Sequence, residues 1–334
     1  MKGEIRQDIT TGTWVIFAPG RGERPSDFPG GEPSSTRAAD YDPDCPFCPG
    51  NEDQIPPILA ETPSGDGPGW QTRVIPNKYP ILSPDGGGRG RSEGFFPRLP
   101  NRGRHEIIIE SPRHNLDLDQ MDLPDLARVL ETWRDRCRAI RSETPKLVPV
   151  IFRNRGPGAG TSLLHPHTQL IAAAVPPPRL IRREETARTY YQQRRSCLYC
   201  DLLAAEEAET SRTLPAGEGL AAFIPFAASG PFETWIIPRG HRPDFADTGS
   251  EEILRLAGTL REILLRLKRI LGVFSYNLVL SPPFPSPDSR PFSHWHLRIL
   301  PRLTTAAGFE FETGIPVNPN LPEEDAGRLR RGES

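Results

Sequence analysis

Apolar residues recur along the chain with strand-like and helix-like periods that divide it into two similar halves. In the first half, the β-rich run 105–110 (HEIIIE) precedes a helical stretch that Asp122 caps, with Pro124 in its first turn. The apolar stripe of this predicted helix consists of Leu126, Val129, Leu130, Trp133, Cys137 and Ile140. We expect strands at residues 148–154 and 165–174 to complete this half.

The second half repeats the same order of elements. Residues 232–238 (FETWIIP) form the matching predicted strand, and Ser250 opens a helix. The apolar stripe of that helix keeps a 3.6-residue period: Ile253, Leu256, Leu260, Leu264, Leu267 and Leu271. Strands predicted at 276–280 and 294–300 close the copy. Two copies of strand, helix, strand, strand predict an α+β protein, with a largely antiparallel sheet and helices packed on one face.

The two halves meet where a run of prolines passes into a charged, helical stretch, residues 176–195. We therefore divide the chain into an N-terminal unit, residues 1–178, and a C-terminal unit, residues 179–334. A chain of 334 residues is long enough for two domains or for two halves of one domain.

Composition excludes several classes of protein. The formal net charge is −2, which gives no general attraction to nucleic acid or to an acidic membrane. No apolar run approaches the roughly 18 residues that cross a bilayer, and the first residues lack the apolar core of a signal peptide. Five cysteines, with two closely spaced pairs, favour metal chelation in a reducing compartment over disulfides. We therefore expect a cytoplasmic protein without a membrane segment.

Cysteine and histidine residues repeat in the same order in each half: a Cys-x-x-Cys pair, a single histidine, then a His-x-His. The first set is Cys45, Cys48, His114 and His165, and the second is Cys197, Cys200, His241 and His294. Two thiolates with two imidazoles form the tetrahedral set that zinc prefers, and four protein ligands leave no position for water. The pattern predicts two structural zinc ions per chain. A single Cys-x-x-Cys can also be a redox motif, and the second site can be partly degenerate.

The first His-x-His opens the pentapeptide His165-Pro-His167-Thr-Gln169. If this segment is a strand, its alternate residues His165, His167 and Gln169 share one face. His165 can then hold the metal while His167 reacts, because a neutral imidazole nitrogen is a good nucleophile toward phosphorus. The amide of Gln169 can donate a hydrogen bond to a phosphate oxygen without adding a competing base.

A glycine-rich loop, residues 154–162 (NRGPGAGTS), leads into this pentapeptide. Such loops let backbone N–H groups and a hydroxyl close on phosphate oxygens, so we expect Gly160 and Ser162 to contact a phosphate. Glycines also make ordinary turns, and only the neighbouring His-x-His makes the loop informative. No such loop precedes the second His-x-His, so we expect His296 to be packed or hydrogen bonded rather than nucleophilic.

Residues 153–169 resemble the active-site signature of galactose-1-phosphate uridylyltransferases, a branch of the histidine-triad superfamily. Further matching segments extend the resemblance over most of the chain: 12–25 (GTWVIFAPGRGERP), 45–51 (CPFCPGN), 75–77 (IPN), 110–114 (ESPRH) and 233–238 (ETWIIP). The resemblance implies that His167 forms a covalent nucleotidyl-histidine and that zinc is bound by Cys45, Cys48, His114 and His165.

The resemblance also implies a set of substrate-binding residues: Asn77 near the nucleoside, and Asn154, Ser162 and Gln169 at the phosphates. Arg21 and Arg24 would reach phosphate, in this family typically from the neighbouring subunit of a homodimer. Histidine-triad hydrolases usually carry a third histidine at the position of Gln169, so this glutamine favours transfer over hydrolysis.

Three functions fit these patterns. The first is ping-pong transfer of UMP from UDP-glucose to galactose 1-phosphate, so that the partners are a UDP-hexose and a hexose 1-phosphate. The second is adenylyl transfer from ADP-glucose to phosphate by the same nucleophile, because residues 308–319 and the second Cys-x-x-Cys resemble relatives with that activity. The third is a zinc-stabilised nucleotide-binding module without turnover.

Overall fold

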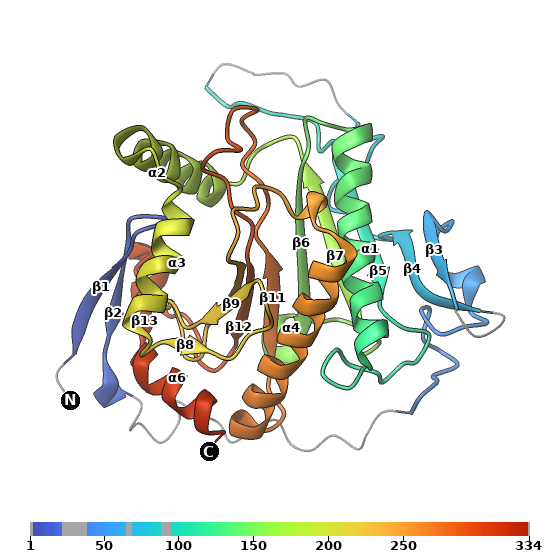
Figure 1. The fold of residues 1–334 in the computed structure, drawn as a ribbon. Coiled ribbons are helices and arrows are strands. Elements are labelled where there is room, and N and C mark those ends of the chain that lie inside the picture. Colours follow the sequence, from blue (N-terminus) through green and yellow to red (C-terminus); the bar gives the residue numbers. More distant parts are fainter. Residues whose placement is uncertain (1–2, 22–38, 65–68, 88–94, 333–334) are drawn as a thin grey trace.

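A ten-stranded sheet runs through both halves of the molecule in the computed structural model, which describes residues 3–21, 39–64, 69–87 and 95–332 (Figure 1). Its strand order is β3 (Ala60–Pro63), β4 (Trp70–Pro76), β5 (Gly103–Ile109), β7 (His167–Ala173), β6 (Val148–Arg155), β11 (Tyr276–Leu280), β12 (Leu297–Pro301), β10 (Thr234–Pro238), β9 (Leu220–Phe223) and β8 (Thr213–Leu214). Every neighbouring pair in this sheet is antiparallel.

The two halves meet at β6 and β11 in the middle of the sheet, where Asn154 lies opposite Asn277. Outward from this pair, the order β7, β5, β4 on one side corresponds to β12, β10, β9 on the other. The expected order of strand, helix, strand, strand is confirmed in both copies, as β5-α1-β6-β7 and β10-α4-β11-β12. The predicted units therefore contribute to one continuous sheet.

Helices α1 (Leu123–Glu143) and α4 (Ser250–Leu271) lie against each other on one face of this sheet (Figure 1). Asp122 caps α1 by accepting a hydrogen bond from the Asp125 N–H, as its sequence position predicts. The predicted stripes of both helices face the sheet, and Trp133 and Leu260 are fully buried there. Removing each such side chain from water contributes about 2 kcal/mol, so this core is the main stabilising element.

Helices α2 (Pro178–Arg194) and α3 (Leu198–Glu209) cover the other face of the C-terminal half. Successive residues of a strand point to opposite faces, so Ile236 packs with α4 while Trp235 and Ile237 pack with α2 and α3. The predicted packing of helices on one face is therefore correct for α1 and α4. Helices α2 and α3 add a layer on the opposite face, which was not predicted.

Shorter elements surround this framework. A small sheet joins β1 (Glu4–Asp8), β2 (Thr13–Phe17) and β13 (Val317–Asn318), with β13 parallel to β2. The remaining elements are α5 (Gly308–Thr313), α6 (Pro322–Arg331) and the 3-10 turns η1 (Pro19–Arg21), η2 (Glu52–Gln54), η3 (Pro157–Ala159) and η4 (Phe245–Asp247). Within the described residues, no helix combines the length and apolar character needed to cross a bilayer.

Candidate active site and metal centres

The four predicted ligands of the first half converge on one buried point. The donor atoms of Cys45, Cys48, His114 and His165 all lie within 4.8 Å of one another. The sulfur of Cys48 is 3.5 Å from Nδ1 of His114 and 3.6 Å from Nδ1 of His165. A tetrahedral ion with typical zinc–sulfur and zinc–nitrogen bonds would hold these atoms roughly 3.6 Å apart. The cluster therefore has the composition and dimensions of a metal site.

The orientation of His165 fits this use. Its Nε2 lies 2.8 Å from the carbonyl oxygen of Ser111. A carbonyl only accepts hydrogen bonds, so Nε2 carries the proton and Nδ1 turns its lone pair toward the two sulfurs. Burial raises the pKa of the Cys45 thiol to about 11, and a bound cation would favour its thiolate instead.

The second half brings three of its four predicted ligands together: Cys197, Cys200 and His241. The sulfur of Cys200 is 3.5 Å from Nδ1 of His241. His294 lies beside this group, its ring centroid 5.4 Å from that of His241, but its Nδ1 faces the Trp295 carbonyl oxygen at 3.0 Å. Its Nε2 is buried and has no hydrogen-bond partner within the described part of the chain. The second cluster is therefore less complete than the first.

His167 stands at the first position of β7, next to the first cluster. The predicted strand 165–174 thus begins two residues late, because Pro166 has no N–H to pair. Nδ1 of His167 lies 2.8 Å from the carbonyl oxygen of His165, so Nδ1 is protonated and Nε2 keeps the lone pair. Nε2 has no hydrogen-bond partner among the described residues. Burial lowers the pKa of His167, and the positive charge of Arg153 lowers it further, so the ring is neutral near pH 7.

His165 and Phe47 link the first Cys/His cluster to His167. His165 points one ring nitrogen at the cluster, and its backbone carbonyl fixes the ring of His167. Phe47, between the paired cysteines, places its ring edge against His165 at 5.9 Å and against His167 at 5.5 Å between centroids. An ion in the cluster would therefore hold His167 in one orientation.

A histidine outside the repeated pattern, His105 on β5, orients Gln169. The N–H of Ile81 donates to Nδ1 of His105, which places the ring proton on Nε2. That nitrogen lies 3.0 Å from Oε1 of Gln169 and donates to it, leaving the amide N–H groups of Gln169 available for another acceptor. Nδ2 of Asn77, the predicted nucleoside contact, lies 3.0 Å from the same ring nitrogen, and because both atoms then carry protons this is a contact and not a hydrogen bond.

Sequence reasoning missed this role of His105. Of the seven histidines, His105 is the one that lies outside the repeated Cys/His pattern. The available signal was the strand period: Ile107 pairs with Gln169 and Ile109 with His167, so alternate residues of β5 share the face of the site.

A buried charge network lies beneath β7 on the opposite face. Arg153 donates to the carboxylate of Glu110 at 2.9 Å, to Asp117 at 2.6 Å and to the hydroxyl of Tyr276 at 3.0 Å. The hydroxyl of Thr168, between His167 and Gln169, donates to Glu110 at 2.7 Å. The network ties the reactive segment of β7 to β6 and β11.

The glycine-rich loop is anchored to the second half. Gly156 and Gly160 have φ of 79° and 80°, a conformation that side chains disfavour. The N–H of Gly158 donates to the hydroxyl of Ser275 at 3.0 Å. Oδ1 of Asn154 accepts from the amide of Asn277 at 2.9 Å.

Alternation along β6 and β7 places Asn154 on the same face as His167 and Gln169, because Arg153 pairs with Thr168. Of the other predicted phosphate contacts, Gly160 and Ser162 are exposed on the loop. Arg24 and the side chain of Arg21 lie outside the described residues.

Comparison with known proteins agrees with this geometry. A family model described as the N-terminal domain of galactose-1-phosphate uridyl transferase matches residues 2–177. The chain is 32% identical to ADP-glucose phosphorylase from Arabidopsis thaliana, over 98% of this chain and 92% of that protein. It is 29% identical to galactose-1-phosphate uridylyltransferase from Thermotoga maritima, over 99% of this chain and 98% of that protein.

Solved structures show the same relationship. The crystal structure of the A. thaliana ADP-glucose phosphorylase with bound ADP-glucose superposes with a TM-score of 0.84, covering 98% of this chain and 99% of that one at 32% identity. A solved uridylyltransferase superposes with a TM-score of 0.75, covering 98% of each chain at 28% identity. The matched half of the chain holds the first metal cluster and the Gly-rich approach to His167. By sequence and by fold, the chain belongs to the galactose-1-phosphate uridyl transferase family.

Proposed function

We propose that this protein is a nucleotidyltransferase in which Nε2 of His167 attacks the α-phosphorus of a nucleoside diphosphate hexose. The N–P bond forms as the bond from the α-phosphorus to the bridging oxygen breaks, and hexose 1-phosphate leaves. A phosphate oxygen of the acceptor then attacks the same phosphorus and frees the imidazole. The observation that supports this most directly is the hydrogen bond from Nδ1 of His167 to the His165 carbonyl, which leaves Nε2 with its lone pair.

The surrounding residues lower the barrier by orientation and by hydrogen bonding. The carbonyl oxygen of His165 stabilises the positive charge that develops on the imidazole ring as the N–P bond forms. Gln169, held through its oxygen by His105, offers its amide N–H groups to the phosphate oxygens. We assign the exposed loop atoms of Gly160 and Ser162, with Asn154, to the same phosphates. In a homodimer, Arg21 and Arg24 of the partner chain would complete the charge balance.

Zinc is the ion we propose for the first cluster and, with His294 turned inward, for the second. The family resemblance and the two-sulfur, two-nitrogen donor set support zinc. Four protein ligands in each site leave the ion to a structural role, in which it holds His165 and thereby His167. No catalytic step passes through the metal.

Two donor and acceptor pairs fit the site. One is UDP-glucose with galactose 1-phosphate, as the relatives named uridylyltransferase suggest. The other is ADP-glucose with inorganic phosphate. It is supported by 32% identity and a TM-score of 0.84 to the A. thaliana ADP-glucose phosphorylase, together with the second Cys-x-x-Cys.

The covalent step can be tested by labelling without an acceptor. Wild-type protein is incubated with UDP-glucose or ADP-glucose carrying ³²P at the α-position, then denatured and separated from free nucleotide. One donor should label the protein with an acid-labile bond and release one hexose 1-phosphate per label. The labelled protein should then pass its nucleotide to galactose 1-phosphate or to inorganic phosphate, which identifies the acceptor.

Two variants make this test specific. His167→Asn should abolish the label, and His296→Asn, the matched change in the second half, should retain it. If neither donor labels the wild type while both bind, the protein is a nucleotide-binding module without turnover. Label that persists in His167→Asn would place the nucleophile elsewhere.

A further inference from the structure

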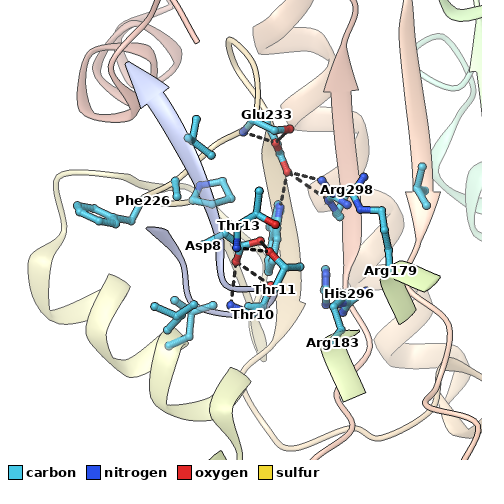
Figure 2. Close-up of a pocket in the computed structure, with 18 of the residues that line it drawn as sticks. Asp8, Thr10, Thr11, Thr13, Arg179, Arg183, Phe226, Glu233, His296 and Arg298 are labelled. Carbon is cyan, nitrogen blue, oxygen red and sulfur yellow. Dashed lines mark hydrogen bonds and ion pairs between the residues drawn. The ribbon is translucent and has the colours of Figure 1, made fainter. Parts of the chain in front are cut away.

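A cavity of about 480 Å³ lies on the second half, on the sheet face that also carries His167 (Figure 2). Its walls come from the β1–β2 hairpin, the start of α2 and the strands β10, β11 and β12. The volume is within the range of small-molecule sites, which span roughly 300–1,000 Å³. The proposed transfer reaction does not use this cavity.

Arginines outnumber carboxylates around the cavity. Four guanidinium groups, those of Arg179, Arg183, Arg212 and Arg298, line it together with three carboxylates, those of Asp8, Glu206 and Glu233. Two of the carboxylates are already paired, Glu233 with Arg298 at 2.7 Å and Glu206 with Arg212 at 2.8 Å. The third, Asp8, accepts hydrogen bonds from the hydroxyls of Thr10 and Thr11.

Two arginines are consequently left without an anionic partner. Arg183 donates to neutral oxygens, the hydroxyl of Tyr199 at 2.9 Å and that of Ser281 at 2.6 Å. Arg179 makes no hydrogen bond or ion pair with any residue that the structure describes, and its side chain reaches toward Arg298 (Figure 2). Burial and the like charge of Arg298 lower the pKa of Arg179, although the nearby carboxylates of Glu233 and Asp8 partly offset this effect. A bound anion would remove this repulsion, and guanidinium groups match phosphate geometry.

The cavity occupies the position in the second half that corresponds to the transfer site in the first. His296 is the second histidine of its His-x-His, as His167 is in the first half. Arg298 follows it at the position that corresponds to Gln169. The ring of His296 is fully buried and stacks on Trp235 at 4.2 Å between centroids. Its Nε2 has no hydrogen-bond partner in the described part of the chain. His296 is one of the residues that line the cavity.

We propose that this cavity is a second, non-catalytic binding site for a phosphate monoester of a sugar or nucleoside, with the phosphate held by Arg179, Arg183 and Arg298. The apolar part of the wall, with Leu180, Val279 and Leu300, accommodates the remainder of the ligand. A sugar phosphate and a nucleoside monophosphate are the two candidate ligands, and both would bind through their phosphate group. Arginine in place of the amide strengthens anion binding, and the missing glycine-rich loop excludes transfer.

Equilibrium dialysis of the full chain tests the site by counting ligands. Radiolabelled glucose 1-phosphate, AMP, UMP and inorganic phosphate are each measured against wild type, Arg179→Ala and Arg182→Ala. Arg182 is exposed on the same turn of α2 and does not line the cavity, which makes it a matched control. At least one of the organic phosphates should bind wild type with two equivalents per chain. Arg179→Ala should weaken one of the two classes at least about tenfold, and Arg182→Ala should leave both unchanged.

Fluorescence of Trp235, whose ring lies in the cavity wall, gives a local readout. The ligand that fills the second class should change this signal in wild type and in the His167→Asn variant alike. Replacing Trp235 by Phe should remove the change while leaving the stoichiometry at two. One equivalent per chain for every ligand, or equal binding by Arg179→Ala and Arg182→Ala, would overturn the proposal. Binding of inorganic phosphate alone would overturn the monoester assignment.

Discussion

The two halves of this molecule carry the same order of strands and helices and similar Cys/His patterns, yet the surroundings of the second histidine of each His-x-His differ. Nε2 lacks a hydrogen-bond partner among the described residues in both His167 and His296, but only His167 follows a glycine-rich loop, and His296 is fully buried and stacked on Trp235. Gln169 offers a neutral amide where Arg298 offers a charge already paired with Glu233. The His-x-His pattern on a strand is therefore shared by two different environments, and the proposed nucleophile belongs to the one that follows a glycine-rich loop.

Buried charges also differ between the halves. The pair Glu110 and Arg153 lies beneath β7 on the face of α1 and α4, together with Tyr276. The pair Glu233 and Arg298 lies on the opposite face, in the wall of the cavity. The two halves therefore share a strand order, but each has a different buried charge pair.

The largest difference in activity between the halves should appear when His167 and His296 are replaced in turn. His167→Asn should reduce transfer at least about 10⁴-fold, because the covalent route disappears. His296→Asn should leave kcat within a few-fold of wild type and mainly lower the free energy of unfolding, by about 1–3 kcal/mol. Steady-state kinetics and urea unfolding measure the two outcomes. A collapse of kcat in His296→Asn would show that the second half takes part in chemistry.

Replacing one cysteine in each metal cluster should separate catalytic from structural consequences. Wild type should contain two zinc equivalents per chain by mass spectrometry, and Cys45→Ser and Cys197→Ser should each contain one. Activity should fall roughly 10–100-fold only in Cys45→Ser, because that ion orients His165 and so His167. A single equivalent in wild type that Cys45→Ser removes would show that the second cluster, with His294 turned aside, holds no metal.

Replacing a buried and an exposed carboxylate by an amide should show how much each ion pair contributes to the free energy of unfolding. Glu110→Gln should lower the free energy of unfolding by about 3–5 kcal/mol, because Arg153 keeps its charge in a buried site. Glu251→Gln removes an exposed partner of Arg255 on α4 and should cost less than about 1 kcal/mol. Urea titrations of the two variants should show this gap, and equal losses would mean that solvent reaches Arg153.

A smaller effect is expected from His105, which orients Gln169. His105→Phe should lower kcat about tenfold with little change in KM, because it loosens a group that acts in the transition state. Gln169→Ala should cause a similar loss, and the double variant should lose little more than either single one. Additive losses would show that His105 acts independently of Gln169.

The smallest effect concerns pH. The attacking imidazole must be neutral, and burial with the charge of Arg153 lowers the pKa of His167 from its usual 6.5. Protonation therefore inactivates the ring only below that value, and activity is lost as pH falls through the lowered pKa. Single-turnover labelling between about pH 5 and 8 should show an acid limb with its midpoint below 6.5. A midpoint at or above 6.5 would contradict the buried, neutral ring.

Local patterns predicted the parts of this structure that depend on neighbouring residues. The period of apolar residues located α1 and α4, and the cap at Asp122 is formed as expected. Ligand order identified the first cluster because two scarce residue types, cysteine and histidine, recur in a fixed order. The same pattern predicted the second cluster, where Cys197, Cys200 and His241 come together and the Nδ1 atom of His294 faces a backbone carbonyl.

Features that depend on distant segments could not be read in this way. A period shows which face of an element is apolar, not which partner covers it, so the second layer formed by α2 and α3 was missed. His105 carries no distinguishing pattern, and its role arises only when β5 pairs with β7. The arginine-lined cavity joins residues near position 8, position 180 and position 298, and no short motif connects them.

The seam between β6 and β11 makes the halves inseparable as well as similar. Separating the two halves would expose the edge of β6 on one fragment and the edge of β11 on the other. It would also expose the side-chain amides of Asn154 and Asn277, which now form a hydrogen bond with each other. Bare edges of this kind pair readily with any available strand. Fragments produced from a split gene should therefore aggregate when expressed alone and recover a soluble, active form only when synthesised side by side.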